Sequence, residues 1–140
     1  MGGRVLSVAS ECVPLVKTGG LADVVGALPG ALAETGWDMR VLLPAYRSLR
    51  AQSKDWPVVW EEADLWGGPG RVLAGEVAGV PLLLLDAPHL YDREGGPYTG
   101  PTGEHPDNAI RFAALSSCWG WMHRRTNWNR VSGRRALRLR

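Results

Sequence analysis

The fold is decided by the stretch Lys17-Thr18-Gly19-Gly20-Leu21-Ala22-Asp23-Val24-Val25. It follows a short apolar run, Arg4 to Ser10, that is typical of a buried parallel strand, and it opens a segment with helical periodicity. Glycines let backbone N–H groups approach a ligand, and the free N–H groups and dipole at a helix start favour negative charge. With Lys17 beside them, these residues predict a phosphate site, most simply one for a nucleotide.

The segment after the glycines predicts a helix that ends before a second strand. Its apolar residues recur on one helical face: Leu21, Val24, Val25, Leu28, Ala31 and Leu32. Pro29 should kink this helix, and Gly36 fits the position just after its end. Asp38 to Leu43 is again a short apolar run, so strand, helix and strand form a βαβ unit. The fold class is therefore α/β, with a Rossmann-like beginning.

The second half of the chain predicts a hairpin, a long loop and a helix. Three runs look like strands: Val58 to Trp60, Arg71 to Val77 and Val80 to Leu85. Ala78-Gly79 is a tight turn between the last two. Asp86 to Pro106 reads as a long loop, and a helix begins at Asp107. We expect Leu82 to Leu85 to be an aggregation hazard, because an incomplete parallel sheet leaves apolar surface uncovered.

Charge divides the chain into two regions. Residues 1–115 hold nine basic and fourteen acidic residues, whereas residues 116–140 hold seven arginines and no acidic residue. Periodicity is also lost after Ser116. We therefore divide the chain into a domain over 1–116 and a basic tail over 117–140, interpreted as out of frame or disordered. There is no signal peptide, no CxxC pair and no apolar run long enough for a membrane, which predicts a cytoplasmic protein.

Two blocks of sequence identify a family. The first, VLSVASECVPLVKTGGLADVVGALPGALAETGWDMRVLLPAYRSL, resembles the N-terminus of bacterial glycogen synthases and plant starch synthases. The second, LLLLDAPHLYDREGGPYTGPTGEHPDNAIRFAALS, resembles the same family in order and spacing. The resemblance covers residues 4–116. It implies part of the N-terminal Rossmann-like domain of a GT-B fold, in a retaining glycosyltransferase that moves glucose from ADP-glucose to an α-1,4-glucan without a metal or cofactor.

The resemblance also assigns roles to single residues. Lys17 is similar to the family's ADP-glucose-binding lysine, and Gly19 and Gly20 would bring backbone toward the sugar nucleotide. Asp23 and Tyr98 match positions near the donor and in the cleft, so the substrate-binding set is Lys17, Gly19, Gly20, Asp23 and Tyr98. Asn108 and Arg111 are expected to hold the long loop in place. No catalytic residue is assigned, because the family's His-Asp-Trp-Gln block and C-terminal residues do not occur in this sequence, and we expect no transfer by this chain alone.

Other functions and roles stay open at this point. The chain could be a non-catalytic fragment that binds a nucleotide or a nucleic acid, the latter through tail arginines interleaved with tryptophans. A dinucleotide-binding module is less favoured, since GxGxxG is absent and Leu43-Pro44 stands where an acidic residue would bind ribose. The three scattered histidines, His89, His105 and His123, predict no metal site and are expected to be solvated.

Overall fold

The structure, a computed structural model, describes residues 2–125. Most of the predicted tail, from residue 126 onward, therefore lies outside the described residues. The elements run in the order β1 (Arg4–Val8), α1 (Gly20–Ala33), β2 (Asp38–Pro44), η1 (Arg47–Leu49), α2 (Arg50–Ser53), β3 (Val58–Glu62), β4 (Gly70–Val77), β5 (Val80–Asp86), α3 (Pro88–Tyr91), β6 (Thr99–Gly100), β7 (Gly103–Glu104) and α4 (Asn108–Arg125).

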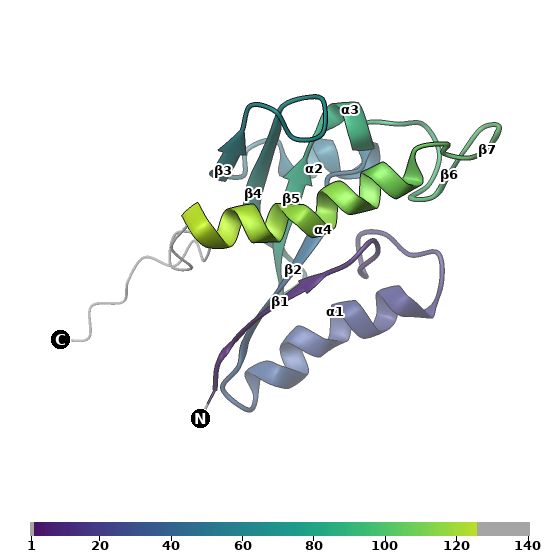
Figure 1. The fold of residues 1–140 in the computed structure, drawn as a ribbon. Coiled ribbons are helices and arrows are strands. Elements are labelled where there is room, and N and C mark those ends of the chain that lie inside the picture. Colours follow the sequence, from purple (N-terminus) through teal and green to yellow (C-terminus); the bar gives the residue numbers. More distant parts are fainter. Residues whose placement is uncertain (1, 126–140) are drawn as a thin grey trace.

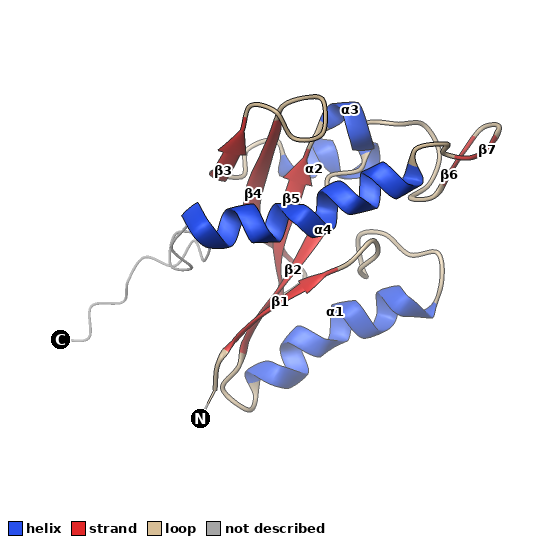
Figure 2. Ribbon diagram, viewed as in Figure 1, coloured by secondary structure: helices blue, strands red, loops and turns tan. Residues whose placement is uncertain are grey.

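A five-stranded mixed sheet forms the centre of the molecule, in the order β1-β2-β5-β4-β3. β1, β2 and β5 are parallel, as the βαβ pattern predicts, and β4 and β3 continue the sheet antiparallel (Figure 2). The hairpin between β4 and β5 is also confirmed. Ala78 and Gly79 both have positive φ, 49° and 80°, which is the backbone that a two-residue turn needs to match the twist of its strands.

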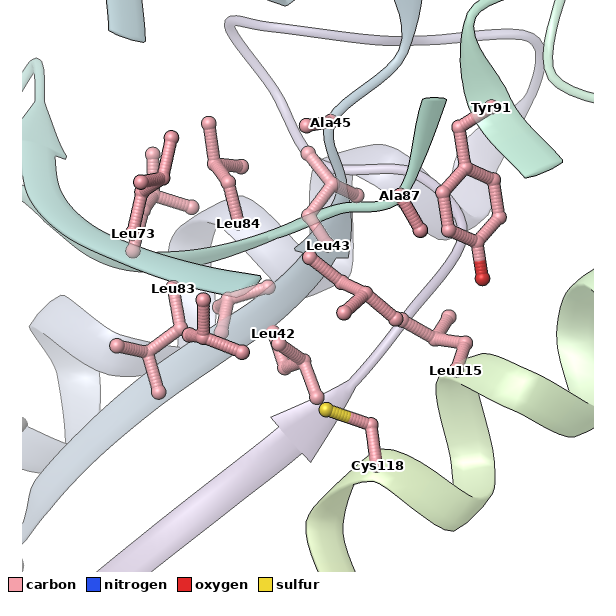
Figure 3. Packing of buried hydrophobic residues seen from close by; sticks show 14 of the residues in the cluster. Leu42, Leu43, Ala45, Leu73, Leu83, Leu84, Ala87, Tyr91, Leu115 and Cys118 are labelled. Carbon is pink, nitrogen blue, oxygen red and sulfur yellow. The ribbon is translucent and has the colours of Figure 1, made fainter. Parts of the chain in front are cut away.

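The core lies on both sides of the central strands, because β2 and β5 are almost continuously apolar and buried. Leu42, Leu43, Leu83 and Leu84 are part of one cluster that also receives residues from α3 and α4 (Figure 3). The structure buries Leu82 to Leu85, and the aggregation hazard expected there stays a prediction. β5 pairs with β2 on one side and β4 on the other, so these leucines are buried and the sheet edges are β1 and β3.

Helix α1 packs on the sheet with a different face from the one predicted. Its buried residues are Ala22, Val25 and Pro29, while Leu21, Val24 and Leu28 are exposed. The small residues allow the helix to approach β2 closely, which leaves the larger side chains outward. The helix continues through Pro29 and ends near Gly36, whose φ is 85°; the Trp37 N–H then donates to the Leu32 carbonyl, 3.1 Å away.

Helix α4 crosses in front of the strands, with α1 behind them (Figure 1). It begins next to the predicted Asp107 and continues to Arg125, past the point where the sequence loses its periodicity. Leu115, Cys118 and Met122 are buried, and Figure 3 shows the first two directed at the β2 leucines. Buried residues three and four apart hold this helix against the core, while Ile110 near its start is exposed.

The predicted long loop from Asp86 to Pro106 is mostly ordered by short elements. α3 follows β5 directly, and β6 and β7 form a small hairpin. Turn residues such as Gly95 and Gly103, both with positive φ, make these tight reversals possible.

Candidate functional site

The site begins where β1 ends, in the loop that leads into α1. The loop folds on itself, with reciprocal backbone hydrogen bonds of 2.9 Å between Cys12 and Val16. The Val13 N–H donates to the Ala22 carbonyl at 3.1 Å, which fixes the loop to the helix. Lys17 to Gly20 are thereby presented at the carboxyl end of the parallel strands, the edge at which open α/β sheets bind ligands.

Gly19 caps α1 without a side chain, so no side-chain acceptor occupies the N–H groups at the helix start. Its backbone is extended, with φ −158°, and any residue could adopt that conformation. A Cβ added at Gly19 or Gly20 would meet no protein atom within 4 Å. Packing within the chain therefore does not require glycine at either position, whereas a ligand that approaches the backbone would.

Lys17 and Asp23 form an ion pair beside these glycines. The Lys17 Nζ lies 2.8 and 2.7 Å from the two carboxylate oxygens of Asp23. Both side chains are about half exposed, at 53% and 54%. A pair this exposed contributes about 1 kcal/mol or less, so another anion can replace the carboxylate at little cost. The structure thus brings together four of the five predicted site residues.

Tyr98, in the loop before β6, lies at the same edge of the sheet although it is far from Lys17 in the sequence. Its hydroxyl lies 2.6 Å from the Ser10 Oγ, and its ring packs against Phe112 with 5.7 Å between centroids. Ser10 also accepts, through its carbonyl, a hydrogen bond of 2.8 Å from the Tyr46 hydroxyl. Burial raises the pKa of Tyr98, so this phenol stays protonated and available as a donor.

A buried carboxylate joins this group, and the sequence analysis missed it. Glu11 is only 2% exposed and accepts a short hydrogen bond from the Thr18 hydroxyl, one residue from Lys17. Glu11 also acts on Tyr98, both through its charge and as a hydrogen-bond partner. The position of Ser10-Glu11 just after the parallel strand β1 was the available signal, because the carboxyl ends of parallel strands carry binding residues.

Asn108 and Arg111 hold the loop that carries Tyr98, as the family resemblance implies. The Asn108 amide donates to the Tyr98 carbonyl at 2.9 Å. Arg111 donates from Nε to the Leu90 carbonyl at 2.7 Å and from Nη1 to the Pro97 carbonyl at 2.8 Å. This expectation is confirmed: α4 and the loop are joined by side chains that satisfy loop carbonyls.

Two of the three histidines are not solvated, contrary to the expectation. His105 is buried with Nε2 3.2 Å from the Gly96 carbonyl, and His89 Nε2 lies 2.8 Å from the Leu65 carbonyl. Both satisfy loop carbonyls, a role that sequence spacing does not reveal. The side chain of His123 lies outside the described part. Within residues 2–125, no cluster of metal-ligating side chains occurs, and no helix has the length and hydropathy to span a bilayer.

A larger cavity lies away from these residues. It measures about 580 Å³ and lies between the β3–β4 side of the sheet and the end of β5, where Asp86 bridges Arg50 and Arg71 at 2.7 and 2.8 Å. None of the predicted site residues lines it. We therefore place the candidate site at the glycine-rich loop, on charge and geometry rather than on volume.

Comparisons with known proteins show the family of the chain. Residues 4–131 match a family described as the starch synthase catalytic domain. A glycogen synthase of Cereibacter sphaeroides is 74% identical over 114 residues, which are 81% of this chain and 24% of that relative. A glycogen synthase of Paracoccus denitrificans is 61% identical over 113 residues, 80% of this chain and 24% of that one. The chain thus spans about a quarter of the length of these curated relatives.

The fold is similar to a solved structure, the catalytic domain of Starch Synthase IV from Arabidopsis thaliana bound to ADP and acarbose. The TM-score is 0.70 at 26% identity, and the likeness covers 89% of this chain and 26% of that chain. The fold is therefore α/β and part of a larger domain. The family match passes Ser116, the predicted boundary between domain and tail, and that boundary stays a prediction.

Proposed function

The chain belongs to the family of starch synthase catalytic domains, and on this premise we propose that it forms part of a glycogen synthase. This is a retaining GT-B glycosyltransferase that transfers glucose from ADP-glucose to the non-reducing end of an α-1,4-glucan. The observation that carries the proposal is Lys17, held by Asp23 beside a helix start that has no side-chain cap.

In this function the glycine-rich loop binds the diphosphate of the sugar nucleotide. Negative charge grows on the diphosphate as the bond to glucose breaks, and a fixed cation and a helix start stabilise that charge. Lys17 supplies the cation, and Gly19 and Gly20 leave room for the ligand at the backbone. Asp23 serves as an exchangeable partner that positions Lys17. The Arabidopsis structure is described as bound to ADP and acarbose, which supports a nucleotide as the class of ligand.

Tyr98 would face the cleft and contact sugar. Its hydroxyl is positioned by Ser10, and the loop that carries it is fixed by Asn108 and Arg111. A hydroxyl on an aromatic ring suits a glucan, because it offers both an apolar surface and a donor. We assign no residue of this chain to bond-breaking chemistry, and no metal or cofactor.

The 140-residue chain alone is expected to bind without turnover. It spans 24% of the Cereibacter relative, and the proposed transfer needs a second domain to enclose the donor. We propose that the protein acts in the cytoplasm on ADP-glucose and a glucan, and that it binds neither a membrane nor a nucleic acid. The alternative is a non-catalytic fragment that only binds a nucleotide. It predicts no transfer of glucose even when the chain is joined to the rest of a glycogen synthase.

A chimera tests the proposal. Residues 4–116 of this chain would replace the matching part of the Cereibacter sphaeroides glycogen synthase, and incorporation of labelled glucose from ADP-glucose into glycogen would be measured. We expect activity, and a loss of about a hundredfold on Lys17→Ala. The matched control is Lys54→Ala, the other lysine of the chain, which is exposed beyond α2. A folded chimera without activity, or one indifferent to Lys17→Ala, would contradict the proposal.

A further inference from the structure

A small cavity adjoins Val16, the residue before Lys17, and three arginines are among the residues that line it. It measures about 80 Å³ and its lining includes Val16, Tyr46, Arg47, Arg93, Gly96 and Arg111. It is far below the several hundred Å³ that a nucleotide or an oligosaccharide occupies, but it exceeds the room that one water needs. Its size therefore selects a small ion.

Two of the three arginines that line this cavity are paired with carboxylates. Asp92 pairs with Arg47 at 2.8 Å, and Asp107 pairs with Arg93 through a short double hydrogen bond. Hydrogen bonds from these arginines hold the pKa of both carboxyl groups below the usual range, so both are charged. The third guanidinium group, on Arg111, has no ion-pair partner within 4 Å among the described residues.

Arg111 is also the most deeply buried of the three, with 0% of its surface exposed. Nε and Nη1 donate to the Leu90 and Pro97 carbonyls and to the Asn108 side chain, while Nη2 makes no hydrogen bond to a described residue. The rings of Tyr91 and Phe112 lie 5.7 and 5.5 Å from the guanidinium carbon. These contacts fix the group, but a buried cation without an anion remains costly.

We propose that this cavity binds a small tetrahedral oxyanion of the phosphate class, with Arg111 as its buried anchor and Arg47 and Arg93 at its mouth. Guanidinium groups bind phosphate through charge-assisted, often paired, hydrogen bonds. The anion would give Arg111 the ion-pair partner that it lacks among the described residues. It is a site separate from Lys17 and does not rest on the proposed function.

One residue, Val16, connects the cavity to the glycine-rich loop. Val16 lines the cavity, bonds to the Cys12 backbone and directly precedes Lys17. An anion in the cavity would therefore restrict the segment that presents Lys17. The phosphate group could belong to free phosphate or to the end of a nucleotide, and competition by ADP distinguishes the two.

The test uses the 140-residue chain and inorganic phosphate, titrated at constant ionic strength with chloride as the exchanged ion. Binding is measured by calorimetry and by amide NMR shifts at residues 92–96 and 111. Arg47→Gln should weaken phosphate binding about tenfold, since it removes one charge-assisted contact at an exposed position. The matched control is Arg71→Gln, a similarly exposed arginine paired with Asp86 outside this cavity, which should leave binding unchanged.

One further variant and a competition experiment complete the test. Lys17→Ala should leave phosphate binding intact, and ADP should not compete if free phosphate is the source; competition by ADP would assign the site to a nucleotide phosphate. The proposal is overturned if phosphate produces no saturable shift at residues 92–96. It is also overturned if Lys17→Ala abolishes binding while Arg47→Gln does not. Thermal melting of each variant confirms that it is folded.

Discussion

The ammonium group of Lys17 lies 2.7 Å from a carboxylate oxygen of Asp23, six residues later and inside the first turns of α1. The pair connects the two sides of the glycine-rich turn. It places the Asp23 carboxylate, which another anion can replace, beside the start of the helix. The same cation that would neutralise a diphosphate is thus already positioned by a carboxylate of the chain.

This relationship predicts the effect of Asp23→Asn. Removing the carboxylate frees Lys17 and removes an anion that competes with the diphosphate, so ADP should bind the chain about two- to fivefold more tightly. Calorimetry at low salt measures the change, and added salt should reduce it. Weaker binding would instead show that Asp23 contacts the ligand directly.

Gly20→Ala should separate stability from binding. The added methyl group meets no protein atom within 4 Å, so the free energy of unfolding should stay equal or rise by about 0.5 kcal/mol. The methyl group would stand where the ligand approaches the backbone, so ADP affinity should fall about tenfold. Gly30→Ala, in the same helix and equally uncrowded, is the control and should change stability alone. Unchanged ADP affinity in Gly20→Ala would place the ligand elsewhere.

Arg111→Leu should destabilise the chain strongly. It leaves the Leu90 and Pro97 carbonyls and the Asn108 side chain without a donor, at about 1–3 kcal/mol for each buried group. Urea denaturation should show a loss of at least about 3 kcal/mol, with faster hydrogen exchange around Tyr98. Arg47→Gln, at an exposed position, should cost about 1 kcal/mol or less. Equal losses in both variants would argue against the anchoring role.

Acid should weaken the fold partly through Asp107. Its hydrogen bond from Arg93 holds the pKa of the carboxyl below the unfolded value of 3.8, so the folded state binds fewer protons. The stabilisation is therefore fully present above that value and is lost as pH falls below it. Asp107→Asn should show a smaller drop in denaturation midpoint between neutral and acidic buffer. Asp55→Asn, at an exposed position, should behave like the parent chain. An unchanged acid response in Asp107→Asn would speak against the pair.

Thiol labelling tests the second half of α4. Burial raises the pKa of Cys118 to about 12 and also raises that of Cys12, so neither thiol should react quickly with a thiolate-seeking reagent in neutral buffer. Both should react in denaturant. Rapid native labelling of Cys118 but not of Cys12 would mean that the helix does not pack beyond Ser116, in favour of the predicted boundary.

Much of the fold could be predicted because its signals are local. The apolar runs at Arg4 and Asp38 and the periodic segment between them are enough for a βαβ unit, and Ala78-Gly79 is enough for a hairpin. Local periodicity failed where burial depends on a neighbour's shape. Small Ala22 packs on the sheet while larger Leu21 and Val24 remain exposed, and α4 continues past Ser116 because Cys118 and Met122 meet the core.

The same division holds for the site. The glycine-rich turn, its lysine and the family could all be recognised from the sequence, since these residues are contiguous and their chemistry is set by backbone freedom and charge. Only the tertiary structure decided that Tyr98 meets Ser10, that Glu11 is buried against Thr18, and that Arg111 is enclosed without a carboxylate. Ser10 and Tyr98 are 88 residues apart, and such contacts depend on which strand ends the topology places side by side.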